Sequence, residues 1–374
     1  MTQTRALMPD YLRLIALFGI VIVNVQFMAF PATGNLTDLP GNVGQDAVVH
    51  WLVNGLATLK TYGLFSFMFG VGLGFQMAAA ERRGVRFGPV YRNRMICLLL
   101  LGMIHGLFLF AGDILVIYAV TGAILYLFRT WAVGRLLRVG GVLLVLQVIV
   151  TTLVLLASPD TGAEITEMEQ AINTGGTFLD VMIWRMISFG FTLPIFLVIQ
   201  GISALGWFCL GLAAVKSGAI DQADHPVWQR ARRWCLVPGV LAALVAAAIW
   251  EWSDGALGAV LTMACAPVAT FGYLGVIAWL ARPPGPMMQR LLKAGGSSLS
   301  IYLGQSILLT TIFAPYGLGL WDALGRGTAT ALAIGVTVVL IGLVSIWRMR
   351  FAQGPFELGL RWFTYLGQKP QANG

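Results

Sequence analysis

Apolar residues dominate this chain in long runs that are separated by short polar segments. Most runs hold about 20 residues, the length that an α-helix needs to cross a lipid bilayer. The pattern therefore predicts an all-α polytopic membrane protein, a bundle of about ten transmembrane helices. The expected spans cover residues 11–30, 62–80, 92–111, 114–129, 133–157, 185–215, 233–251, 256–280, 297–314 and 327–347.

The composition also indicates a membrane protein, and it restricts the kinds of partner that we expect. Hydrophobic residues make up 58% of the 374 residues and charged residues 11%, whereas soluble domains carry about 25% charged residues. The formal net charge of +8 resembles that of nucleic-acid-binding proteins, but the basic residues lie in short loops between apolar runs. There they orient the chain and contact anionic lipid. We therefore expect the lipid bilayer as a partner and no nucleic acid.

The loops alternate in charge along the whole chain. Because basic loops stay in the cytoplasm, this alternation places both termini on the cytoplasmic side. The first apolar run reaches Phe30 without a small-residue cleavage site, which favours a membrane helix over a cleaved signal peptide. The basic segments are 1–13, 81–94, 129–138, 216–233, 282–293 and the tail from 348, and the acidic or neutral ones are 31–61, 112–113, 158–180, 252–255 and 315–326.

A proline-rich break at residues 282–286 divides the chain. It separates an N-terminal eight-helix membrane block, residues 1–281, from a C-terminal two-helix block with a cytoplasmic tail, residues 282–374. We expect both blocks to form one integrated membrane domain. Three short amphipathic segments are predicted outside the spans, at residues 45–60, 163–173 and 287–294.

The strongest chemical signal is His105, deep within an apolar run, followed by Asp113 at a Gly-Asp turn. Ionisable groups inside a membrane span are costly and rare. A neutral imidazole oriented by a carboxylate is the usual arrangement of a general base. The competing interpretation is a buried histidine that only holds the turn in place.

Arginines mark the opposite end of the same span. Arg92 and Arg94 begin it, and Arg13 lies at the start of the first span. Arg92 precedes His105 by about 20 Å of helix, at 1.5 Å per residue. Arginine binds phosphate in a bidentate manner, so this end of the bundle is a candidate phosphate site. The alternative is a set of positive-inside anchors.

Further polar side chains lie at membrane depth. Asn24 lies in the outer half of the first span, and Tyr302, Gln305 and Ser306 share one face of a later helix. An amide without a partner in hydrocarbon costs several kcal/mol. These groups are therefore either hydrogen bonds between helices or the wall of a site.

Other familiar sites are not predicted. His50 and His225 have no ligand spacing with another His, Cys or carboxylate, so we expect no metal. The four cysteines fall in or beside apolar runs, as small core residues do. The glycines of residues 70–74 lie within a membrane helix, which favours helix packing over phosphate binding.

Taken together, the ordered segments resemble the YeiB-like family of bacterial membrane proteins, which carry a C-terminal domain of unknown function, 418. Residues 64–72 (LFSFMFGVG) are similar to the family's LFSxLFGxG segment. Tyr11 and Leu14 depart from its opening pattern. The segments that carry the resemblance are 10–24, 64–72, 94–115, 296–306, 354–357 and 361–365.

The resemblance implies a bacterial cytoplasmic (inner) membrane protein related to the transmembrane acyltransferase superfamily. It implies the transfer of an acyl group, for example acetyl, from cytoplasmic acyl-CoA to an acceptor hydroxyl or amine at the outer side. Acyl-CoA would then be a co-substrate and not a permanently bound cofactor. By that analogy His105 acts as general base with Asp113, and Arg92, Arg94 and Arg13 hold the CoA phosphates. The groups beside the acceptor and the developing oxyanion are Asn24, Tyr302, Gln305 and Ser306.

Two other functions fit the same sequence. A bundle with a glycine-rich interior and a buried histidine also suits a small-solute transporter or permease, although the chain has no evident inverted repeat. A non-catalytic membrane scaffold is the third alternative. The acceptor (a sugar, a lipid or a small molecule), the acyl group and the oligomeric state, including a homodimer, stay open.

Overall fold

The computed structural model describes residues 6–31, 43–157 and 162–368, and every regular element in this part of the chain is helical. The elements are α1 (Met8–Met28), α2 (Gln45–Leu56), α3 (Lys60–Arg82), α4 (Phe87–Phe108), α5 (Leu115–Leu127), α6 (Val133–Ala157), α7 (Gly162–Gly175), α8 (Phe178–Lys216), η2 (Ala219–Asp221), α9 (Pro226–Trp252), α10 (Gly255–Leu280), α11 (Pro286–Gly295), α12 (Ser298–Phe313), α13 (Arg326–Arg350) and α14 (Pro355–Thr364).

Local sequence fixes many of the helix starts. Pro226, Pro286 and Pro355 each open a helix, where a missing N–H costs nothing and φ already suits the helix. Asp254 caps α10 by accepting a hydrogen bond from the Leu257 amide at 2.9 Å. The turn between α2 and α3 passes through Leu59 in a left-handed conformation, with φ of 65°, which separates the two helices.

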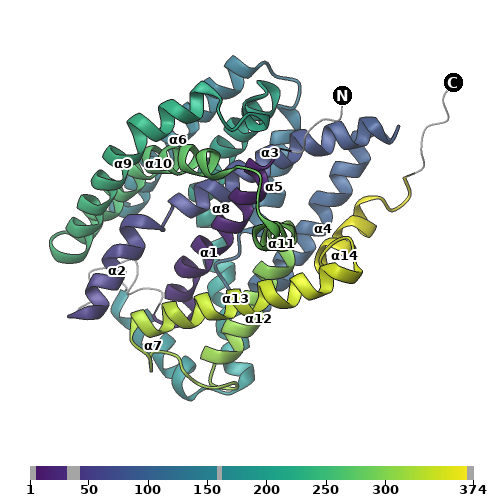
Figure 1. The fold of residues 1–374 in the computed structure, drawn as a ribbon. Helices are drawn as coiled ribbons and strands as arrows, with labels where there is room; N and C mark the ends of the chain where they lie inside the picture. The colour runs from purple at the N-terminus through teal and green to yellow at the C-terminus, as the bar shows by residue number, and fades with distance from the viewer. Residues whose placement is uncertain (1–5, 32–42, 158–161, 369–374) are drawn as a thin grey trace.

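Helix α1 runs through the centre of the bundle, where it contacts α3, α11, α12 and α13 (Figure 1). Helices α9 and α10 lie side by side at the left of that view, and α3 crosses α8 in the interior. Glycines permit this crossing: a Cβ on Gly70 would collide with the Phe208 carbonyl, and one on Gly211 with the Phe67 carbonyl. The expected packing role of Gly70 is thus observed.

Ten helices occupy the ten ranges expected as membrane spans. Within the described residues, seven stretches are long and apolar enough to cross a bilayer, with α2 and α3 counted as one. Helix α4 does not meet that criterion, and α5 and α12 are short, at 13 and 16 residues. The structure therefore supports an all-helical, multi-pass membrane protein. The count of ten spans and the cytoplasmic position of the termini stay predictions.

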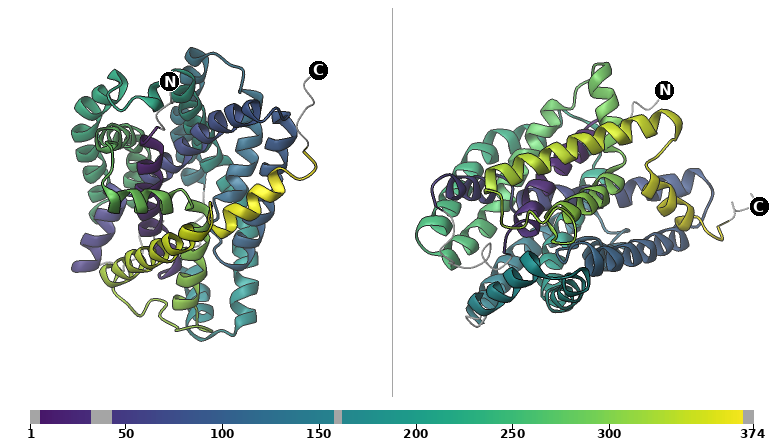
Figure 2. Two further views of the ribbon diagram at one scale, coloured as in Figure 1. Left: turned by 45° about the vertical axis from the view of Figure 1, so that its right-hand side comes forward. Right: turned by 90° about the horizontal axis from the view of Figure 1, so that it is seen from below.

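The three predicted amphipathic segments are present as α2, α7 and α11. The break expected at residues 282–286 falls between α10 and α11, and α1 packs against helices on both sides of it. The sequence analysis did not predict α14. This helix lies against α4 and α12 (Figure 2), so the end of the described chain folds back onto the bundle.

Candidate active site

His105, Asp113 and Ser306 form a continuous hydrogen-bonded chain inside the bundle. The His105 Nδ1 atom lies 2.8 Å from Asp113 Oδ1, and His105 Nε2 lies 2.8 Å from Ser306 Oγ. Exposure is 1% for His105, 2% for Asp113 and 2% for Ser306. His105 is in the last turn of α4, Asp113 follows it in the turn to α5, and Ser306 comes from α12. The structure therefore brings together three residues that span 201 positions.

Asp113 is held in place by the start of α5. Its Oδ2 atom accepts a hydrogen bond from the Val116 amide at 2.8 Å, one of the amides that a helix start leaves without a backbone partner. Gly102 on α4 makes room for this arrangement, because a Cβ there would lie 2.8 Å from Asp113 Oδ2 and 2.6 Å from Val116 N. Both oxygens of the Asp113 carboxyl group are therefore engaged, one by His105 and one by the Val116 amide.

The hydrogen-bond pattern assigns the histidine tautomer. An ionised carboxylate can only accept, so His105 Nδ1 carries the proton and donates to Asp113. His105 Nε2 is then an acceptor, and the Ser306 hydroxyl donates to it. The second contact of Ser306 Oγ, to the Tyr302 carbonyl oxygen, is longer at 3.4 Å. The chain of donors runs from serine to histidine to aspartate.

The other two polar residues of α12 have different surroundings. Tyr302 packs with its ring centroid 5.1 Å from that of His105. Its buried hydroxyl makes no hydrogen bond of normal geometry within the described residues. Gln305 instead donates to the Leu17 carbonyl at 3.3 Å and to Thr337 Oγ1 at 2.9 Å. Gln305 thus ties α12 to α1 and α13 and is turned away from His105.

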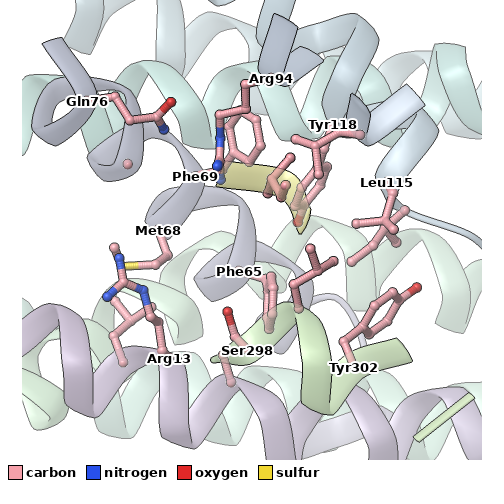
Figure 3. A pocket seen from close by; sticks show the side chains of 17 residues that line it. Arg13, Phe65, Met68, Phe69, Gln76, Arg94, Leu115, Tyr118, Ser298 and Tyr302 are labelled. Atoms are coloured by element: carbon pink, nitrogen blue, oxygen red, sulfur yellow. The ribbon is translucent and has the colours of Figure 1, made fainter. Parts of the chain in front are cut away.

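A pocket of about 140 Å³ adjoins this network on the far side of Tyr302. Figure 3 shows Arg13 and Arg94 reaching toward the same space from opposite sides, with Tyr118 and Tyr302 at its other end. Leu360 of α14 also lines it. Neither His105 nor Ser306 is part of the lining, so Tyr302 stands between the cavity and the histidine.

Three buried polar atoms in this lining make no hydrogen bond of normal geometry with the part of the chain that the structure describes. They are Arg94 Nε, Gln76 Oε1 and the Tyr302 hydroxyl. Buried polar groups are nearly always paired, and leaving one unpaired costs about 1–3 kcal/mol. Three such atoms around one cavity make it a candidate site for a polar ligand.

The charges of the pocket favour an anion. Arg13 pairs with Asp10, with a nitrogen–oxygen distance of 3.3 Å, and Arg13 and Glu357 both lie close enough to Arg94 to act on it electrostatically. Glu357 is engaged elsewhere, because its carboxylate accepts from the Ser300 amide at 3.0 Å and from Ser300 Oγ. Two arginines thus face one cavity, and no carboxylate among the described residues forms an ion pair with Arg94.

The remaining predicted site residues are not part of this constellation. Arg92 is exposed and lies outside the pocket lining, and Asn24 is half-buried on α1 and is also absent from the lining. Sequence reasoning missed Gln76 and did not weigh Tyr118. Gln76 had a detectable signal, since it is an amide within an apolar run.

A second buried polar network lies around α2. His50 Nδ1 is 2.5 Å from Glu251 Oε2, and His50 Nε2 is 3.2 Å from the Asn54 amide nitrogen. Lys60, fully buried, donates to the Asn54 carbonyl at 2.7 Å. Nearby, Arg326 donates to Gln26 Oε1 at 2.9 Å.

Acidic groups surround Arg326 from other segments. Its backbone amide donates to Asp46 at 2.8 Å. In the connection before α13, burial raises the pKa of the Asp322 carboxyl, Arg326 opposes this rise, and Asp46 adds to it. This network joins α1, α2, α9 and α13.

Comparison with known proteins finds a family match for part of the chain and relatives that span nearly all of it. Residues 214–367 match the family described as protein of unknown function (DUF418). The chain is 29% identical over 396 residues to the uncharacterized protein YxaH of Bacillus subtilis (strain 168), covering 100% of this chain and 97% of the relative. It is 28% identical over 386 residues to the uncharacterized protein YeiB of Escherichia coli (strain K12), covering 96% of each. These matches support the resemblance of this chain to the YeiB-like family.

The names of these relatives state no activity, and no solved structure matches the chain. The DUF418 match includes Tyr302, Gln305 and Ser306, whereas His105 and Asp113 lie before it. The hydrogen-bonded chain of His105, Asp113 and Ser306 therefore joins a serine within the DUF418 match to a histidine and a carboxylate that precede it.

Proposed function

We propose that this protein is a membrane acyltransferase that moves an acyl group from cytoplasmic acyl-CoA to an acceptor hydroxyl or amine at the outer side. The observation that carries the proposal is the buried His105–Asp113–Ser306 chain beside a pocket lined by Arg13 and Arg94. A histidine whose tautomer is fixed by a carboxylate is suited to take a proton from a hydroxyl.

The pocket supports the donor side of this reaction. Arginine pairs well with phosphate and carboxylate oxygens, and the free Nε of Arg94 is available to an anionic donor. A volume of about 140 Å³ resembles that of cavities that hold one benzene molecule. The cavity thus accommodates the acyl end of the donor, while the nucleotide stays outside, toward Arg13.

Roles follow for the other residues. The Tyr302 hydroxyl, which makes no hydrogen bond of normal geometry among the described residues, is a candidate donor to the oxyanion that forms when the thioester carbonyl is attacked. Gln305 keeps α12 in register with α1 and α13. Helix α14 covers one side of the pocket through Leu360. The proposed acceptor is a sugar, a lipid or another small molecule.

Acyl-CoA binding by the purified full-length protein tests the proposal. A ligand at about 100 times its Kd adds about 2.7 kcal/mol to the free energy of unfolding, so saturating acetyl-CoA should raise the Tm in detergent by several degrees. Pantetheine, which lacks the phosphates, is the matched control and should have a smaller effect. If neither acetyl-CoA nor longer acyl-CoA species change the Tm or bind, acyl transfer is excluded, and a permease or scaffold function remains.

A further inference from the structure

Ser306 occupies the place that a substrate hydroxyl would need if His105 acted on it directly. Its Oγ atom lies 2.8 Å from His105 Nε2, the only ring nitrogen that Asp113 leaves free to accept a proton. A general base works on the group within hydrogen-bond reach. In this structure that group belongs to the protein.

We propose that Ser306 is the nucleophile of the reaction and carries the acyl group as an ester between donor and acceptor. This inference rests on the proposed acyl transfer and adds a covalent intermediate to it. The arrangement of serine, histidine and aspartate is recognised by geometry and not by order in the chain. Both distances of 2.8 Å and the burial of all three side chains meet that geometry.

The first half-reaction balances with the groups present. Ser306 Oγ attacks the thioester carbonyl while its proton passes to His105 Nε2, and Asp113 stabilises the resulting imidazolium. The carbon–sulfur bond breaks, the thiolate leaves, and it takes the proton from His105 to give CoA thiol. Ser306 now holds the acyl group as an oxygen ester, and His105 is neutral again.

The second half-reaction repeats this chemistry with the acceptor. Its hydroxyl or amine gives a proton to His105 Nε2 as it attacks the ester carbonyl. The bond between Ser306 Oγ and the acyl carbon breaks, and His105 returns the proton to the serine. A two-step route also explains how donor and acceptor can use one histidine in turn without being bound together.

Tyr302 controls access between the pocket and Ser306. Its ring lies between the cavity lining and His105, and it precedes Ser306 by one helical turn. Its hydroxyl makes no hydrogen bond of normal geometry among the described residues, so no such bond opposes a movement of the ring. The acyl end of a donor in the pocket can then reach Ser306 Oγ.

The test uses purified full-length protein and two reagents without any acceptor. Radiolabelled acetyl-CoA should leave about one acetyl ester per chain on the Ser306 peptide and release an equal burst of free thiol. Diisopropyl fluorophosphate, which does not depend on recognition of CoA, should phosphorylate the same serine. Ser306→Ala and His105→Ala should lower both labels below about one-tenth of the wild-type level.

Two further variants keep the experiment decisive. Ser306→Cys retains a nucleophile of similar size and should form a thioester, which excludes loss of folding as the cause of a lost label. Thr311→Ala removes an exposed hydroxyl of the same helix and should label normally.

The outcomes separate the two proposals. If acetyl-CoA binds but neither reagent modifies Ser306, the covalent intermediate is overturned while acyl transfer stands. Labelling of His105 in place of Ser306 also overturns it. If diisopropyl fluorophosphate modifies Ser306 but no acyl-CoA binds, the activated serine is real and the acyl-CoA function fails.

Discussion

The bundle contains two buried pairs of a histidine and a carboxylate, and they differ in what lies beyond the histidine. His105 with Asp113 and His50 with Glu251 both make the contact through Nδ1, at 2.8 and 2.5 Å. The second nitrogen of His105 meets a serine hydroxyl, whereas that of His50 meets the Asn54 amide on its own helix. An amide can hold the ring but cannot act as a nucleophile.

The surroundings of the two pairs also differ in how fully their polar atoms are hydrogen-bonded. The pocket beside Tyr302 has three polar atoms without a normal hydrogen bond, and none of its lining residues comes from α2, α9 or α13. Around His50, by contrast, Asn54 is engaged by its side chain with Thr58 and by its carbonyl with Lys60. A network closed on itself holds helices in register, while an open one can take a ligand. A buried histidine–carboxylate pair alone therefore does not identify a site.

The largest expected contrast comes from removing each histidine. Replacing His105 with Ala removes the proposed general base, so release of free thiol from acetyl-CoA should fall by about 10³-fold or more. Replacing His50 with Ala should leave that rate within about threefold of wild type but lower the free energy of unfolding by about 3 kcal/mol, because Glu251 becomes a buried charge without its partner. Thiol release and thermal unfolding in detergent measure the two effects.

The opposite result would change the assignment of the site. If His105→Ala unfolds the protein and His50→Ala abolishes thiol release, the network around His50 and Glu251 is the functional one. His105→Gln serves as a second variant, since an amide fills the same space and can still donate to Asp113.

Proximity in sequence explains why the His105–Asp113 pair could be predicted but not its contact with Ser306. His105 and Asp113 are eight residues apart across one turn, so local geometry was enough to suggest the pair. Ser306 lies 201 residues from His105, and helical spacing placed it on a polar face without saying which helix that face meets. The choice among Tyr302, Gln305 and Ser306 therefore required the packing of α12 on α4.

Helix rotation explains the remaining differences. Arg92 and Arg94 are two positions apart on α4, which places their side chains about 200° apart around the helix axis. Only Arg94 therefore lines the pocket. The contact between His50 and Glu251 also spans 201 residues, which no local pattern reveals. The ten helical segments followed from apolar length alone, whereas α14 was missed because its 10 residues are too few for a span.

The next contrast in size concerns two arginines, half-buried Arg94 beside the pocket and buried Arg326 in the network around His50. Arg94→Ala removes the guanidinium from the pocket lining, and a hydrogen bond to a charged group contributes about 1.5–3 kcal/mol. The Kd for acetyl-CoA should therefore rise by about 10- to 100-fold. Arg326→Gln, in the closed network, should leave this Kd unchanged and lower the Tm, because Gln26 loses its charged donor. Equilibrium binding of radiolabelled acetyl-CoA and thermal unfolding measure the pair. An unchanged Kd in Arg94→Ala removes the arginine from the donor site.

The smallest expected effect tests whether the His105–Asp113 contact depends on the close approach of α4 to the start of α5 at Gly102. In Gly102→Ala the new Cβ would lie 2.6 Å from Val116 N and 2.8 Å from Asp113 Oδ2, so α5 and the carboxylate must shift away from His105. A displacement of this size should slow thiol release by about 5- to 10-fold and lower the free energy of unfolding by about 1–3 kcal/mol. Gly141→Ala on α6 is the matched control, since nothing lies within 4 Å of its Cβ, and alanine there should stabilise the helix slightly. Equal rates in the two variants would mean that the position of Asp113 does not limit the reaction.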